Sequence, residues 1–233
     1  MIRKQSHDLL DNRKTAGYNE DNTIQNDSCV GGGCMNLEIH DTMVPGTRLT
    51  RAAAGNVTGR DFLDRVFFPS DGVMLSRIRD VSGIDGSTLQ NWIKRGWVEN
   101  APLKRYTVDQ GAHILIINML RSCVQLDHIA FLLHYINGRV DDRSDDIIRD
   151  SVLYDYICKI LDRLIEEDNC SGASIRGVIR EVTADYAEIR PGAHERLNNA
   201  LEIIVAAYYA AVLKRHADDM LIDLRTRVTD TVG

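Results

Sequence analysis

Several features that mark special classes of protein are scarce or missing in this chain of 233 residues. Only 4 prolines and 6% aromatic residues occur, and the long apolar stretches lack the alternation of strands, which favours a mainly helical protein. The 5 cysteines are odd in number and irregularly spaced, which argues against a disulfide framework. No apolar run is long enough to span a bilayer, and no apolar core follows Arg3 and Lys4 as in a secretion signal. We therefore expect a cytoplasmic protein without a membrane segment.

Motifs of catalysis and of cofactor binding are also missing. The chain contains no nucleophile–base set, phosphate-binding loop or dinucleotide fingerprint, so we expect neither an enzyme nor a bound cofactor. Cys29, Cys34 and His40 are metal-binding residue types, but their spacing is loose and a fourth ligand is missing, which favours a plain flexible tail. Residues 141–146 are rich in aspartate without the spacing of a calcium loop, which favours helix capping or a surface loop.

Isolated histidines and cysteines elsewhere fit structural roles better than chemical ones. His113, His128 and His134 fall on two expected helices, where packing or surface positions are the usual interpretation. Nothing near Cys123, Cys158 or Cys170 in the sequence lowers a thiol pKa, so we interpret these residues as buried or inert.

Charge is distributed unevenly along the chain. The net charge is -6, so the molecule as a whole is not a basic nucleic-acid binder. Residues 72–138 nevertheless carry 7 basic and 5 acidic side chains, whereas residues 139–168 carry 5 basic and 10 acidic ones. A basic middle followed by an acidic segment is consistent with a binding module joined to a partner-binding or regulatory module.

Composition and periodicity divide the chain into three parts. Residues 1–56 are rich in Asn, Asp, Thr and Gly and predict a flexible segment. Residues 57–138 predict a domain of short helices, and residues 139–233 a C-terminal helical domain for oligomerisation or regulation. The expected helices span residues 58–68, 74–82, 86–95, 107–121, 126–136, 151–167, 174–189 and 194–225, the last long enough for a bundle or a dimer interface.

The stretch from Gly72 to Tyr106 predicts two short helices joined by a tight turn. Gly83 breaks the first helix, Asp85 is placed to cap the second, and Gly96 ends it. This pattern is typical of a helix-turn-helix. Residues 97–106 follow as a short two-stranded wing or loop, and Thr107 with Gln110 predicts a capping box for the next helix.

The second helix of this pair carries the candidate binding residues. Leu89, Trp92 and Ile93 face inward, so the opposite face is polar. We expect that face to enter the major groove of double-stranded DNA, because amide side chains can bond adenine edges. The candidate base contacts are Ser87, Gln90, Asn91 and Lys94, and the candidate phosphate contacts are Arg77, Arg95, Lys104 and Arg105.

Two family resemblances rest on these residues. Leu75–Ile78, Val81–Ile84, Thr88–Trp92, Arg95–Trp97 and Arg105–Thr107, in that order, resemble the MerR helix-turn-helix. Leu89–Gly96, Ile116–Arg121, Tyr135–Gly138 and Asp145–Ile148 resemble the bacterial family called domain of unknown function 1836, over residues 58–164. The resemblance implies a mainly α protein: a MerR-like winged helix-turn-helix, then a helical bundle with a long final helix. It also implies a homodimer formed through that helix.

The chain departs from the MerR pattern in ways that leave its function open. Gln90, Asn91 and Trp92 stand where MerR proteins usually have an arginine and tyrosines, and the wing is short. A DNA-binding transcription regulator is the first hypothesis, with no effector carried over from the family. A protein-interaction module that uses the same fold without binding DNA is the alternative, because the acidic segment and the long helix suit a protein partner equally well.

Overall fold

The computed structural model describes residues 42–67, 72–101, 105–139, 142–167 and 171–232. The described part of the chain is mainly helical, as the composition predicted, and ends in one long helix. It contains α1 (Gly59–Val66), β1 (Val73–Met74), α2 (Leu75–Ser82), α3 (Gly86–Lys94), β2 (Arg105–Tyr106), α4 (Val108–Leu120), α5 (Leu126–Asn137), α6 (Asp150–Glu166), α7 (Gly172–Val182) and α8 (Ala193–Val232).

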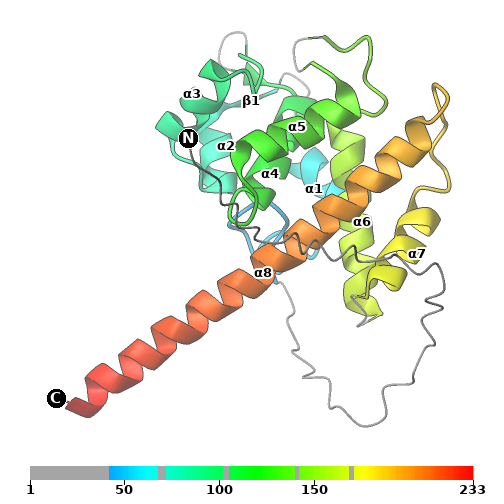
Figure 1. Ribbon diagram of the computed structural model, residues 1–233. Coiled ribbons are helices and arrows are strands. Elements are labelled where there is room, and N and C mark those ends of the chain that lie inside the picture. Colours follow the sequence, from blue (N-terminus) through cyan, green and yellow to red (C-terminus); the bar gives the residue numbers. More distant parts are fainter. Residues whose placement is uncertain (1–41, 68–71, 102–104, 140–141, 168–170, 233) are drawn as a thin grey trace, which may run out of the picture. The chain divides into compact units, whose positions relative to one another are not determined.

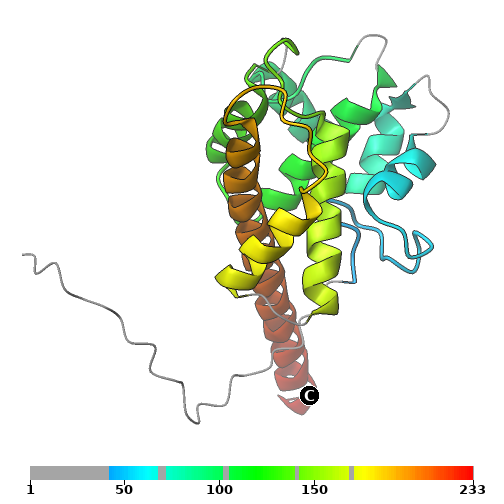
Figure 2. The same cartoon turned by 90° about the vertical axis from the view of Figure 1, so that its right-hand side faces the viewer.

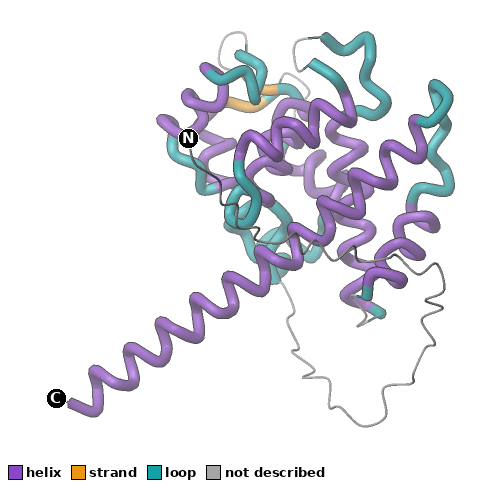
Figure 3. Tube along the Cα trace, in the orientation of Figure 1, coloured by secondary structure: helices purple, strands orange, loops and turns teal. Residues whose placement is uncertain are grey.

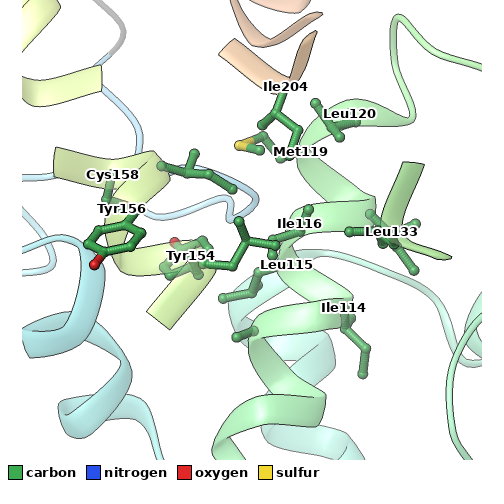
Figure 4. Close-up of a cluster of buried hydrophobic side chains, with 14 of the residues drawn as sticks. Ile114, Leu115, Ile116, Met119, Leu120, Leu133, Tyr154, Tyr156, Cys158 and Ile204 are labelled. Atoms are coloured by element: carbon green, nitrogen blue, oxygen red, sulfur yellow. The ribbon is translucent and has the colours of Figure 1, made fainter. Parts of the chain in front are cut away.

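Helix α4 forms the centre of the fold because its sequence is apolar on nearly every side. The predicted capping box starts the helix. Thr107 Oγ1 accepts a hydrogen bond from the backbone N–H of Gln110 at 3.2 Å, and Gln110 Oε1 accepts one from the backbone N–H of Thr107 at 3.0 Å. Ile114 and Ile116 are fully buried, and a helix without a polar face must be covered by neighbours. Figure 4 shows side chains of α4 beside Leu133 of α5, Tyr154 of α6 and Ile204 of α8.

The remaining helices pack around α4 and against one another. Helices α1, α6 and α8 pack against it, and α7 packs between α6 and α8. Figures 1 and 2 place α2 and α7 on opposite sides of α6. The first half of α8 is buried against the other helices, while residues 213–229 are exposed and extend away from them. With 40 residues, α8 is about 60 Å long.

The small sheet differs from the wing that the sequence predicted. Strand β2 pairs with β1 in antiparallel fashion, with Val73 opposite Tyr106 and Met74 opposite Arg105 (Figure 3). The strand at residues 105–106 therefore does not pair within residues 97–106 but with the segment before α2. The pairing ties the end of the wing segment to the start of α2.

Residues 42–56 form a non-helical segment that packs against the helices, although the sequence placed them in a flexible segment. Val44 is completely buried, and the Pro45 carbonyl accepts a hydrogen bond from the Tyr154 hydroxyl at 2.7 Å. Arg51 pairs with Asp162 of α6 at 2.6 Å. The flexible segment therefore cannot extend to residue 56. Residues 1–41, with Cys29, Cys34 and His40, lie outside the described residues.

The prediction of a helix from 174 to 189 is wrong at its C-terminal end, because α7 stops at Val182. Thr183 is fully buried, and its hydroxyl lies 2.8 Å from the Ile179 carbonyl, 3.1 Å from His194 Nε2 and 2.9 Å from Asn198 Oδ1. Three residues later, the Tyr186 hydroxyl donates to the Ile147 carbonyl at 2.8 Å. These contacts hold the chain in an irregular path between α7 and α8.

Helices on the two sides of the boundary predicted after residue 138 are in contact. Helix α4 before it packs against α6 and α8 after it, and α5 before it packs against α8. Whether the two parts fold as independent domains stays a prediction. None of the described helices combines the length and the apolar character that crossing a membrane requires.

Candidate nucleic-acid interface

Helix α3 begins at a side-chain cap that the sequence predicted. Asp85 accepts hydrogen bonds from the Ser87 hydroxyl, from the Thr88 hydroxyl at 2.7 Å and from the Thr88 amide at 2.7 Å. These bonds, that from Ser87 foremost, hold the pKa of Asp85 far below its ordinary value, so the carboxylate is charged in any neutral buffer. The cap fixes where α3 begins but also engages Ser87, which was a candidate base contact.

The two faces of α3 have opposite character, as the spacing predicted. Leu89 and Trp92 are completely buried, and the guanidinium of Arg121, which follows α4, lies 5.8 Å from the centre of the Trp92 ring. The opposite face is exposed and carries all four predicted base contacts: Ser87, Gln90, Asn91 and Lys94. Gln90, Asn91 and Lys94 form no side-chain hydrogen bond with the described residues, so their polar groups are available to a partner.

The turn between α2 and α3 is held from both sides. Gly83 ends α2 with φ +73°, a conformation that residues with a side chain rarely adopt. Asn118 of α4 donates to the Ser82 carbonyl and to the Gly46 carbonyl, each at 2.9 Å. Arg48 adds a bond from its amide to the Val81 carbonyl at 3.0 Å and one from its Nε to the Asp80 carbonyl at 2.9 Å. The orientation of α3 is therefore fixed by α4 and by residues 46–48.

Exposed arginines flank this pair of helices without carboxylate partners. Arg77 and Arg79 lie on α2 and Arg95 follows α3; none of the three forms an ion pair with the described residues. The Arg95 guanidinium lies 5.0 Å from the centre of the Trp97 ring, which orients it without neutralising its charge. Lys104, a predicted phosphate contact, lies outside the described residues.

The structure places one of the predicted phosphate contacts in a separate cavity and brings two other arginines to the start of α3. Arg105 on β2 lines a cavity with Arg143 and Arg149, and no residue of α3 lines that cavity. Arg48 and Arg79 instead border a cleft with Gly83 and Asp85, at the start of α3. Neither arginine was among the contacts predicted from the sequence. Arg79 shares the short α2 segment with Arg77 and was detectable, whereas the position of Arg48 depends on contacts across more than thirty residues.

A buried charged group lies behind the wing segment. His113 of α4 places Nδ1 3.3 Å from Asp150 Oδ2 and donates from Nε2 to the Trp97 carbonyl at 2.9 Å. Arg143 reaches the same carboxylate oxygen at 3.1 Å. Both ring nitrogens of His113 face acceptors, and only the protonated ring can donate to both. The group joins the loop after α3 to the start of α6.

Burial and charge act in opposite directions on the pKa values of this group. Burial lowers the pKa of His113, but the charge and hydrogen bond of Asp150, together with the Trp97 carbonyl, outweigh burial and raise it. Burial likewise raises the pKa of Asp150, but His113 and Arg143 outweigh it and lower that pKa. Both shifts favour the charged forms of His113 and Asp150, so they favour an ion pair.

The described residues that were considered for metal or redox chemistry lie in environments that suit structural roles. Cys158 is completely buried, and burial raises the pKa of its thiol to about 12, which leaves it unreactive. Cys123 is exposed, and Cys170 lies outside the described residues. In the aspartate-rich segment, Asp146 pairs with Arg143 at 3.2 Å and Asp142 accepts from the Ser144 amide at 2.9 Å. Residues 142–149 form a loop, one of the two structures predicted for them.

Comparison with known proteins adds a family resemblance but no activity. No solved structure matches the chain. The "Uncharacterized protein YkrK" of Bacillus subtilis (strain 168) is 25% identical over 152 residues, which cover 62% of this chain and 64% of that protein. The match therefore spans less than two thirds of the relative. The sequence model described as "Domain of unknown function (DUF1836)" matches residues 62–157, so the segment from α1 into α6 is similar to this family.

Proposed function

We propose that the chain is a DNA-binding transcription regulator in which α2 and α3 form a MerR-like helix-turn-helix. One observation carries the proposal: α3 is capped and buried on one side, while its exposed side presents Gln90, Asn91 and Lys94. A helix that enters the major groove needs a fixed apolar back and an unengaged polar front of this kind.

The unpaired arginines around α3 supply the second part of the argument. Arg77, Arg79 and Arg95 are exposed and form no ion pair with the described residues. Phosphate contacts from such side chains provide most of the affinity of a protein for DNA, and they act independently of sequence. A local basic surface is sufficient for this, even though the chain as a whole carries a net charge of -6.

The exposed half of α8 favours a homodimer. Leu213, Met220 and Leu224 expose 50%, 58% and 53% of their surface, and with Ala217 they repeat at intervals of four, three and four residues. The same spacing continues back through Ala210, Ala206 and Ile203, which are exposed or half-buried. A stripe with this period on a protruding helix is the pattern by which two helices pack side by side. We infer that the partner is a second copy of the chain.

A salt titration tests DNA binding. Fluorescence anisotropy of labelled, mixed genomic fragments is measured from low to physiological salt. We expect affinity to fall steeply with salt for the natural chain, and Arg77→Ala or Arg79→Ala to reduce the slope of log K against log salt by about 0.9 each. Arg163→Ala and Arg176→Ala are matched controls, because they remove the same charge from exposed arginines that already pair with Glu181 at 3.0 Å and Glu202 at 2.8 Å. Binding that ignores salt, or equal losses in both sets, would refute the proposal.

Sedimentation tests the dimer. The double variant Met220→Asp and Leu224→Asp changes exposed side chains only, so we expect a folded monomer where the natural chain is a dimer. A truncation before His194 is a poor test, because Leu201 and Ile204 of the first half of α8 are completely buried and their loss would unfold the protein. An unchanged particle mass for the double variant would contradict the inference.

Protein docking without DNA is a second candidate function, favoured by a different surface. On α5, Phe131 and Tyr135 expose 68% and 39% of their surface and lie one helical turn apart. Aromatic residues of this kind are enriched at protein interfaces. The variant Phe131→Ser separates the two functions. It removes an aromatic side chain from the docking surface and should weaken protein docking. It leaves the α3 surface intact and should not change DNA affinity.

A further inference from the structure

A cavity of 820 Å³ lies beside β2, and no residue of α3 lines it. It is bordered by β2, by the N-terminal turn of α4 and by the 143–149 segment that leads into α6. Its volume falls within the range of about 300–1,000 Å³ that is usual for small-molecule sites. Ile147 and Ile148 form part of its wall, so it offers apolar as well as charged surface.

The carboxylates that line this cavity already have partners within the protein. Glu99 Oε2 accepts from Gln110 Nε2 at 2.9 Å, and Asp109 Oδ1 accepts from the Ser151 amide at 3.1 Å. Asp146 pairs with Arg143 at 3.2 Å. Arg143 is shared further with the buried Asp150 at 3.1 Å, so its guanidinium is engaged as well. The acidic side chains of the cavity are therefore part of the internal network.

Two other arginines at the cavity have no such engagement. Arg105 on β2 and Arg149 at the start of α6 are exposed, and their side chains form no ion pair or hydrogen bond with the described residues. A guanidinium group presents its donors in a fixed fork that matches a carboxylate or a phosphate. Two of them, in the lining of one cavity together with Ile147 and Ile148, fit a molecule with two negative charges and a short hydrocarbon body.

We propose that this cavity binds a small organic dianion, held by Arg105 and Arg149, and that the ligand regulates DNA binding. The regulatory part rests on the proposed function and on the sequence prediction that Arg105 contacts a DNA phosphate. One guanidinium cannot serve the ligand and the DNA backbone at once, so the two compete. Linkage then requires that the ligand weaken DNA binding by the same factor by which DNA weakens ligand binding.

Ligand binding is tested first without DNA. Calorimetry measures the affinity of succinate, inorganic phosphate and butyl phosphate, with butyrate as a singly charged comparison and ionic strength held constant with chloride. We expect at least one dianion to bind more tightly than butyrate, and Arg105→Ala and Arg149→Ala each to weaken that dianion about tenfold or more. Arg77→Ala is the matched control, because Arg77 does not line the cavity, and we expect it to leave the affinity unchanged. Failure of all three dianions to bind, or equal affinity in Arg149→Ala and the natural chain, would overturn the proposal.

A second arm separates this proposal from the DNA-binding proposal. The dianion that binds is added to the anisotropy titration at constant ionic strength. We expect it to weaken DNA binding by the natural chain and to have no effect on Arg149→Ala, which keeps its affinity for DNA. Loss of ligand control in Arg77→Ala, whose cavity is intact, would overturn the competition. If the natural chain binds no DNA, the proposed function fails, while the calorimetry still decides whether the cavity is an anion site.

Discussion

Arg77 and Arg79 on α2 differ from Arg163 on α6 and Arg176 on α7, although all four are exposed. Arg163 and Arg176 each pair with a glutamate of another helix, at 3.0 Å and 2.8 Å, so their charge is used within the fold. Arg77 and Arg79 have no carboxylate partner among the described residues. Exposed ion pairs contribute little stability, about 0–1 kcal/mol, so the difference matters less for folding than for recognition. A phosphate group of a partner can therefore reach Arg77 and Arg79 without displacing a carboxylate of the protein.

The buried group around His113 extends this comparison, because there charge serves folding alone. His113→Leu removes both hydrogen bonds and leaves Asp150 buried with fewer partners. Breaking a buried pair in this way costs about 3 kcal/mol or more, and we expect urea unfolding to show a loss of that size. Arg77→Ala should change the free energy of unfolding by about 0.5 kcal/mol or less. Similar losses in the two variants would remove the distinction between folding charges and recognition charges.

The amide face of α3 gives the next largest effect, on specificity rather than stability. A side chain that bonds a base edge through two hydrogen bonds discriminates against other bases by about 1–3 kcal/mol. We expect Gln90→Ala and Asn91→Ala to flatten sequence preference at one or two positions, as measured by selection from random duplexes and sequencing. Arg77→Ala should lower the affinity for all selected sequences alike. A uniform loss from Asn91→Ala would place it among the phosphate contacts.

Local signals explain which parts of this interface could be predicted from the sequence. The Asp85 cap, the Gly83 turn and the Thr107–Gln110 box each depend on residues within four positions, and all three are present in the structure. The β1–β2 pairing and the contacts of Arg48 join residues about thirty positions apart, and no periodic pattern marks them. The same limit explains Arg105, whose place on the cavity depends on how the 143–149 segment folds back. Sequence alone therefore predicted the helices of the candidate site but not the strand and loop residues around them.

The pH dependence of stability is a smaller effect that distinguishes the buried group around His113 from the exposed arginines of α2. Because the pKa of His113 is raised in the folded state, its contribution is complete below the ordinary histidine value and is lost as pH rises through the folded value. The pKa of Asp150 is lowered, so its contribution is present above the ordinary aspartate value and is lost as pH falls through the folded value. We expect urea midpoints of the natural chain to decline as pH rises above the ordinary histidine value and through the folded value, and His113→Leu to lack that decline. A decline of equal size in His113→Leu would assign it to another group.

The smallest effect is expected for Ser87→Ala. This variant tests whether a side chain that is already hydrogen-bonded within the protein contributes to sequence preference. Ser87 lies on the same exposed face as Asn91, but its hydroxyl donates to the Asp85 carboxylate. We therefore expect Ser87→Ala to leave sequence preference nearly unchanged in the same selection, whereas Asn91→Ala changes it. The substitution keeps both Thr88 bonds to Asp85, so α3 should still begin at the same residue. A loss of specificity in Ser87→Ala as large as in Asn91→Ala would mean that the hydroxyl leaves Asp85 when DNA binds, and that exposure alone identifies the recognition residues.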